Sequence, residues 1–146
     1  MVACYMTQSM DALKILIVED QLAARQTLTT SLRTRNVTLI DTAVDGQIGA
    51  EMVEQAAQNG TPYDIVFLDW DIPKITGIDL LKRFRSEERF ANTAFVMVTA
   101  MSMQNNVLDA IKSGATAYMV KPVTHATMIH RFDSIFSWVQ HRHAMC

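Results

Sequence analysis

The chain has 146 residues, of which 49% are hydrophobic and 19% are charged, and its formal net charge at pH 7 is -2. This length and balance predict one globular domain with its own core and exclude a disordered segment, and the small net charge gives no indication of nucleic-acid binding. No run approaches about 20 consecutive apolar residues and residues 1–10 lack the pattern of a signal peptide, so we expect a cytoplasmic protein without a membrane partner.

Apolar runs alternate with amphipathic stretches from the start of the chain. Residues 13–18 (LKILIV) form a short apolar run with β-branched side chains, which predicts a buried strand. Residues 21–35 place Leu on one side and Arg on another at helical spacing, which predicts a helix. Residues 37–44 then predict a second strand, and residues 47–58 a second helix that ends at Asn59-Gly60.

The same alternation continues along the rest of the chain. Further strands are predicted at residues 65–68, 94–98 and 116–120, and further helices at 78–85, at 103–113, and from an N-cap at Thr124 onward. The charged residues between 83 and 89 are interpreted as a solvated surface run without a nucleic-acid signature. Five strand–helix units predict an α/β fold in which helices cover both faces of a parallel sheet.

Chemically useful side chains follow four of the five predicted strands. Glu19 and Asp20 come after the first strand and Asp69 after the third, while Thr99 follows the fourth and Lys121 the fifth. The carboxyl ends of parallel strands share one edge of a sheet, and ligands bind there. We therefore expect these side chains to meet in one pocket.

Such a pocket brings three carboxylates together, which is unfavourable unless a cation joins them. Oxygen ligands with room for water suit Mg²⁺, with Asp20 and Asp69 as direct ligands. With the charge masked, Asp69 can attack phosphorus, and Lys121 and Thr99 can bind the phosphoryl oxygens. The expected product is an aspartyl phosphate.

These residues, in this order, resemble the CheY-like receiver domain of bacterial two-component response regulators, from about Leu13 to Trp138. The resemblance implies a flavodoxin-like, doubly wound (βα)₅ fold with the strand order 2-1-3-4-5. The roles that it implies are an acidic pair at Glu19 and Asp20, a phosphoacceptor at Asp69 in LDWDIPKITG, a switch hydroxyl at Thr99 in VTA, a lysine followed by a cis-peptide proline at Lys121-Pro122, an aromatic switch at Tyr118, and a backbone carbonyl of Asp71 on the metal.

The resemblance also implies the mode of action. A single receiver domain over residues 12–141, between an N-terminal extension (1–11) and a tail (142–146), would not be an enzyme. It would take its phosphoryl group from a histidine kinase or a histidine phosphotransfer protein in a Mg²⁺-dependent reaction. It would then present a changed surface of the fourth helix, fifth strand and fifth helix to a protein partner, and the same surface is a candidate for a homodimer.

Two other interpretations stay open at this point. Glu19, where the family often has Asp, and the extra carboxylate of Asp71 are compatible with a receiver-shaped interaction module that is never phosphorylated. Asp69-Trp70-Asp71 after an apolar run also resembles the DxD nucleophile motif of haloacid dehalogenase-type phosphatases. In that family the DxD lies near the start and a second acidic pair lies later, which is the reverse of the order here.

Overall fold

The computed structural model describes residues 12–100 and 104–144. The predicted extension (1–11), with Cys4, and the last two residues, with Cys146, lie outside the described residues. The five strands are β1 (Lys14–Val18), β2 (Leu39–Ala43), β3 (Ile65–Asp69), β4 (Ala94–Thr99) and β5 (Ala117–Val120). All neighbouring strands pair in parallel, as the alternating pattern predicted, and their order β2-β1-β3-β4-β5 is the one that the resemblance to receiver domains implied.

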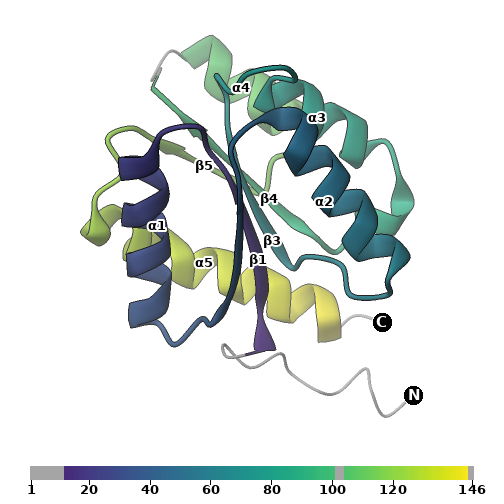
Figure 1. The fold of residues 1–146 in the computed structure, drawn as a ribbon, viewed down its shortest axis with the longest axis horizontal. Helices are drawn as coiled ribbons and strands as arrows, with labels where there is room; N and C mark the ends of the chain where they lie inside the picture. Colours follow the sequence, from purple (N-terminus) through teal and green to yellow (C-terminus); the bar gives the residue numbers. More distant parts are fainter. Residues whose placement is uncertain (1–11, 101–103, 145–146) are drawn as a thin grey trace.

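Helices cover both faces of this sheet (Figure 1). They are α1 (Leu22–Thr34), α2 (Gly46–Gln58), α3 (Gly77–Arg85), the short 3₁₀ helix η3 (Glu88–Phe90), α4 (Gln104–Lys112) and α5 (His125–Ala144). α1 and α5 lie on one side of the sheet, and α2, α3 and α4 lie on the other. The last helix, α5, continues beyond residue 141, where the receiver domain was predicted to end.

The sheet separates two hydrophobic cores. Side chains alternate across each strand, so Leu16 and Val66 face the core under α2 and α3, while Ile17 and Phe67 face the core under α1 and α5. β3 and β4 are buried along their whole length, whereas β2 is largely exposed because it is an edge strand. Near-continuous apolar runs are what a strand covered on both faces requires.

The helix ends follow the signals in the sequence. The side chain of Asp45 accepts a hydrogen bond of 2.8 Å from the backbone N–H of Ile48 and caps the start of α2. Gly60 follows α2 with a φ of 78°, and Gly114 follows α4 with a φ of 100°. Both conformations favour glycine because it has no Cβ, so the helix end predicted at Asn59-Gly60 is confirmed.

Two segments differ from the sequence-based expectation. β2 begins at Leu39 instead of residue 37, because Asn36 takes a left-handed conformation (φ 67°) and the N–H of Val37 turns back to the carbonyl of Leu32. The charged run between 83 and 89 is not wholly solvated. Arg85 is half-buried and bonds backbone carbonyls, and the run leads into the unpredicted helix η3, where Phe90 is buried.

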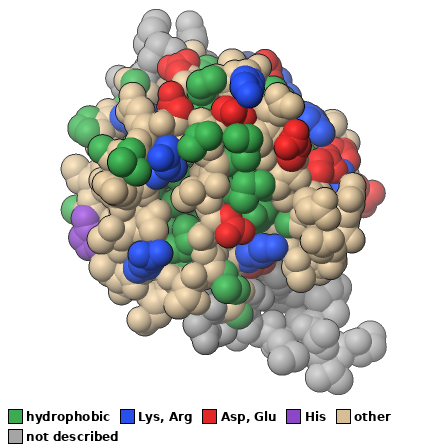
Figure 2. Space-filling model, viewed as in Figure 1, with side chains coloured by type: hydrophobic (Ala, Val, Ile, Leu, Met, Phe, Trp, Pro, Cys, Tyr) green, Lys and Arg blue, Asp and Glu red, His purple; other side chains and the backbone are tan. Residues whose placement is uncertain are grey.

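The outer surface carries mixed charge. On the face in Figure 2, acidic and basic side chains are interspersed with hydrophobic ones, and neither positive nor negative charges form an extended field.

Among the helices of the described residues, none has both the length and the apolar character needed to cross a bilayer.

Candidate functional site

The strand register brings the predicted site residues to one edge of the sheet. Val18 pairs with Leu68, so Glu19 and Asp69 follow at the same level on neighbouring strands. Asp69 itself pairs with Val98, the residue before Thr99. Thr99 pairs with Val120, the residue before Lys121. Four strands thus deliver these groups to one place, as expected for the carboxyl edge of a parallel sheet.

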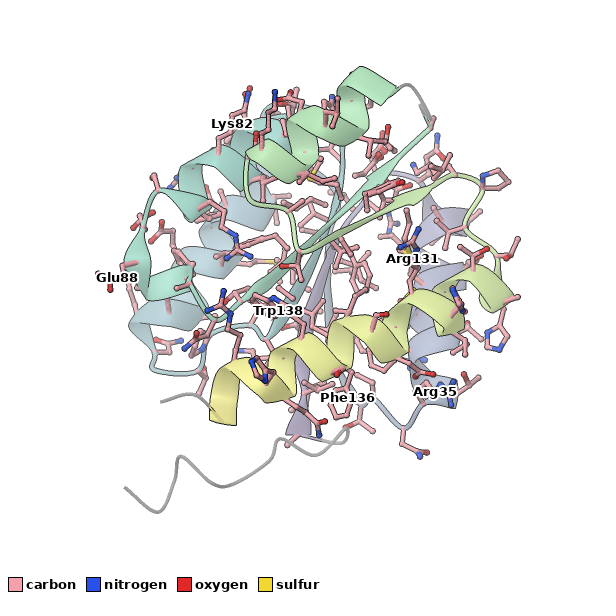
Figure 3. The ribbon with its side chains drawn as sticks, turned by 180° about the vertical axis from the view of Figure 1, so that it is seen from behind. Arg35, Lys82, Glu88, Arg131, Phe136 and Trp138 are labelled. Carbon is pink, nitrogen blue, oxygen red and sulfur yellow. The ribbon has the colours of Figure 1, made fainter. Side chains whose placement is uncertain are left out.

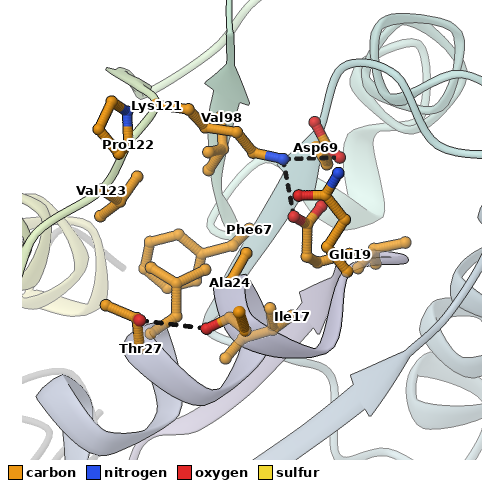
Figure 4. Close-up of a pocket in the computed structure, with 14 residues that line it drawn as sticks. Ile17, Glu19, Ala24, Thr27, Phe67, Asp69, Val98, Lys121, Pro122 and Val123 are labelled. Carbon is orange, nitrogen blue, oxygen red and sulfur yellow. Dashed lines mark hydrogen bonds and ion pairs between the residues drawn. The ribbon is translucent and has the colours of Figure 1, made fainter.

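Lys121 joins the two buried carboxylates of this edge (Figure 4). Its Nζ donates to Oε1 of Glu19 at 2.7 Å and to Oδ2 of Asp69 at 3.1 Å. The exposed fraction is 2% for Glu19 and 5% for Asp69, so both charges are removed from most of the solvent. Charge-assisted hydrogen bonds in such surroundings are stronger than those between neutral groups.

Burial changes the protonation of this cluster. Desolvation is the main reason that the pKa of Glu19 rises from 4.5 to about 7, and the neighbouring Asp69 adds to the effect while Lys121 opposes it. Burial also disfavours the charge of Lys121, but its hydrogen bonds to Glu19 and Asp69 together raise the pKa of Lys121 above its ordinary value. The cluster is therefore short of positive charge.

The acidic residues fit a divalent cation. Glu19, Asp20 and Asp69 each offer a carboxylate oxygen, and these oxygens lie within 4.8 Å of one another. Among the described side chains, Oε2 of Glu19 is one of the buried polar atoms without a hydrogen-bond partner. A set of carboxylate oxygens, one of them unsatisfied and buried, has the chemistry of a site for a hard ion such as Mg²⁺.

The connection from β3 to α3 packs closely around Asp69. The N–H of Asp71 points to Oδ1 of Asp69 at 3.4 Å, and the N–H of Gly77 donates to the carbonyl of Trp70 at 3.0 Å. A Cβ on Gly77 would lie 2.2 Å from the carbonyl oxygen of Asp69, so a side chain does not fit there. Gly77 is thus a positioning residue that the sequence showed only as the end of LDWDIPKITG.

The other predicted residues lie on β4 and β5 and in the segments that follow β3 and β5. Thr99 is buried at the end of β4, and its carbonyl accepts the N–H of Lys121 at 2.8 Å. The Lys121–Pro122 peptide bond is cis. The side chain of Asp71 is exposed. Tyr118 lies further back on β5, half-buried against the α2–α3 core, with the guanidinium of Arg131 5.4 Å from its ring.

An apolar cavity of about 270 Å³ adjoins the cluster and was not predicted (Figure 4). Glu19, Asp69 and Lys121 line one part of it, while Phe67, Val98 and side chains of α1 and of the segment after β5 line the rest. The signal for it in the sequence is a set of small residues on α1, Ala23, Ala24 and Thr27, which leave space beside Pro122 and Val123.

Comparison with known proteins gives one consistent result. Residues 15–133 match the profile of the response regulator receiver domain. The chain is 33% identical over 124 residues to the chemotaxis protein CheY-3 of Vibrio cholerae, covering 85% of this chain and 92% of that protein. It is 32% identical over 127 residues to the chemotaxis protein CheY of Pseudomonas aeruginosa, covering 87% and 98%.

Solved structures agree with these sequence matches. One is described as the CheX-CheY-BeF₃-Mg²⁺ complex from Borrelia burgdorferi; it has a TM-score of 0.76 and 30% identity, with 85% of this chain and 89% of that chain covered. A receiver domain protein from Methanospirillum hungatei, with a TM-score of 0.75 and 22% identity, supports the fold. It covers 88% of this chain and 98% of that chain.

Proposed function

This chain belongs to the family of response regulator receiver domains. We propose that it is a signalling module switched by phosphorylation of Asp69. The observation that carries the proposal is the double contact of Lys121 with Asp69 and Glu19 at the carboxyl edge of the sheet. The donor is a histidine kinase or a histidine phosphotransfer protein, and the protein acts in the bacterial cytoplasm.

The proposed transfer moves one phosphoryl group from nitrogen to oxygen. A carboxylate oxygen of Asp69 forms a bond to phosphorus as the phosphorus–nitrogen bond of a phosphohistidine breaks, and the released imidazole takes up a proton. The ammonium of Lys121, 3.1 Å from Oδ2 of Asp69, donates to a phosphoryl oxygen. The hydroxyl of Thr99 binds another oxygen.

Glu19, Asp20, Asp69 and the backbone carbonyl of Asp71 would hold Mg²⁺, with Glu19 bound directly or through water. A bound Mg²⁺ neutralises the carboxylates and the incoming phosphoryl oxygens. The buried and unsatisfied Oε2 of Glu19 supports this assignment. The single ammonium of Lys121 serves two carboxylates in this structure, so one further cation balances the cluster.

The proposed output is a change of surface. A phosphoryl group adds about two negative charges and three acceptor oxygens at Asp69. Thr99 moves toward it and Tyr118 turns into the space behind, which changes the face formed by α4, β5 and α5 for a protein partner or for a second copy of the chain. A bias of a few kcal/mol between two existing states is sufficient for such a switch.

The test is direct labelling with a small phosphodonor. We expect acetyl phosphate and Mg²⁺ to add the mass of one phosphate to the parent protein, and Asp69→Asn to remain unlabelled because the acceptor oxygen is lost. Asp71→Asn is the matched control, since this carboxylate is exposed two residues away and should leave labelling intact. Equal labelling of Asp69→Asn would place the chemistry elsewhere, and an unlabelled but folded parent would favour an interaction module that is never phosphorylated.

A further inference from the structure

A second polar hollow lies at the edge of the sheet opposite to Asp69. It has a volume of about 440 Å³ and is lined by Arg85 at the end of α3, Glu87 and Glu88 at the start of η3, Thr116 before β5, and Trp138 and Arg142 on α5. In Figure 3, Trp138 projects from α5 toward the segment that carries Glu88. This volume is within the range of small-molecule sites, about 300–1,000 Å³.

The guanidinium of Arg85 is held rigidly at the back of this hollow. It donates from Nε to the carbonyl of Gly114 at 2.7 Å, from Nη1 to the carbonyl of Phe90 at 2.8 Å, and from Nη2 to the hydroxyl of Thr116 at 3.0 Å. The ring of Phe95 lies 4.7 Å from its Cζ. All of these partners are neutral, so they orient the charge without compensating it.

A second arginine, Arg142, also lies beside Trp138. The Cζ atoms of Arg142 and Arg85 are 5.0 Å and 6.0 Å from the Trp138 ring. Within the described ranges, neither arginine forms an ion pair with an acidic side chain. Burial is the main reason that the pKa of Arg85 falls to about 10, and the nearby charge of Arg142 lowers this pKa further.

The acidic residues of the hollow do not provide that compensation. Glu87 accepts a hydrogen bond of 2.9 Å from Nε of Arg89, which already balances its charge. Glu88 is exposed at the rim. An anion that enters between the two arginines therefore gains two charge-assisted contacts at a site where one guanidinium is already desolvated and fixed.

We propose that this hollow binds a small phosphate-bearing molecule, with the phosphate between Arg85 and Arg142 and the remainder of the ligand against Trp138. Two guanidinium groups match a dianionic phosphate in charge, and Arg85 keeps N–H donors beyond the three that it uses within the protein. The half-buried ring of Trp138, which both guanidinium groups approach, borders the space that is left for the remainder of the ligand. The site contains none of the residues of the acidic cluster. A test of ligand binding there is therefore independent of the proposed phosphorylation of Asp69.

Titration of the full-length protein in EDTA tests this site, because removing divalent cations keeps phosphate away from the acidic cluster. The probes are inorganic phosphate, pyrophosphate and AMP, followed by the indole N–H signals of the two tryptophans in nitrogen-15 NMR spectra. We expect a saturable shift of the Trp138 signal and none of Trp70. Tighter binding of AMP would identify a nucleotide-like ligand, and equal affinities would identify the phosphate as the recognised group.

Variants separate this site from nonspecific charge binding. Arg142→Gln should weaken binding by about tenfold, because one charge-assisted contact is lost. Glu88→Gln should strengthen it, and Arg33→Gln, an exposed arginine on α1, should leave it unchanged. The proposal is overturned if no probe gives a saturable Trp138 shift, if Arg142→Gln binds as tightly as the parent, or if only Trp70 responds.

Discussion

Glu19 carries its two carboxylate oxygens in unequal surroundings. Oε1 accepts a hydrogen bond from Lys121, whereas Oε2 is buried and meets no hydrogen-bond donor among the described residues. A buried acceptor without a partner costs about 1–3 kcal/mol of folding free energy. The fold tolerates this cost at the place where a cation would remove it, which is typical of a functional position.

This arrangement predicts how the stability of the cation-free protein depends on pH. Because the folded-state pKa of Glu19 is about 7 and its ordinary value is 4.5, the carboxyl group favours the fold while it is protonated. That contribution is complete below 4.5 and is lost as the pH rises through about 7. We expect Glu19→Gln to remove this decline and to be more stable than the parent by about 1–3 kcal/mol above the higher pKa.

Urea unfolding in EDTA across this pH range measures the effect. Added Mg²⁺ should stabilise the parent more than Glu19→Gln, because the variant loses one anionic ligand. Parallel pH profiles for the two proteins, with equal gains from Mg²⁺, would contradict the placement of Glu19.

At the scale of the elements, the β3–α3 connection decides where Asp69 lies. The chain folds back so closely that the N–H of Gly77 reaches the carbonyl of Trp70, and the α carbon of Gly77 faces the backbone of Asp69. The side chain of Thr76 then caps α3 through the N–H of Asp79. The position of Asp69 thus depends on the entry into α3 as well as on β3.

Gly77→Ala should therefore damage both stability and labelling. We expect a loss of about 1–3 kcal/mol in unfolding free energy, since a Cβ at 2.2 Å from a backbone oxygen forces the connection to move. Slower phosphorylation by acetyl phosphate should accompany it. Gly60→Ala is the control: it has open space but a positive φ, so it should cost about 1 kcal/mol and leave labelling unchanged. Parent-like labelling of Gly77→Ala would argue against this role.

The sequence predicted these elements well where periodicity and caps agree, and less well where tertiary contacts decide. The five strands and the ends of α2 and α4 follow from apolar runs and from Gly60 and Gly114. The burial of Arg85 does not, because it depends on carbonyls of residues 90 and 114 that only the fold brings near. The cavity beside α1 was missed for the same reason, since small residues indicate space only once their neighbours are known.

At the scale of the whole molecule, the paired strands β4 and β5 connect the acidic edge with the proposed output face. Thr99 is the last residue of β4. Tyr118 lies on β5 and pairs with Met97 of β4, two residues before Thr99. Tyr118 is half-buried, and Arg131 of α5 lies over its ring. A movement of Thr99 at the end of β4 therefore occurs close to Tyr118, whose ring contacts Arg131 of α5.

We expect the response of Tyr118 to depend on the hydroxyl of Thr99. Beryllium fluoride with Mg²⁺ should change the fluorine NMR signal of fluorotyrosine at position 118, assigned with Tyr118→Phe, in the parent protein. Thr99→Ala and Asp69→Asn should abolish the change, whereas Thr99→Ser should retain it because the hydroxyl is kept. An unaltered response in Thr99→Ala would show that the coupling bypasses this residue.

The contact between Lys121 and Glu19 joins positions 102 residues apart and lies where four strands of the sheet end. During synthesis, Asp69 leaves the ribosome well before Lys121, whose amine completes the cluster. The acidic cluster is therefore complete only after the last strand, and a chain cut before residue 121 would carry Glu19 and Asp69 without the ammonium that pairs with both.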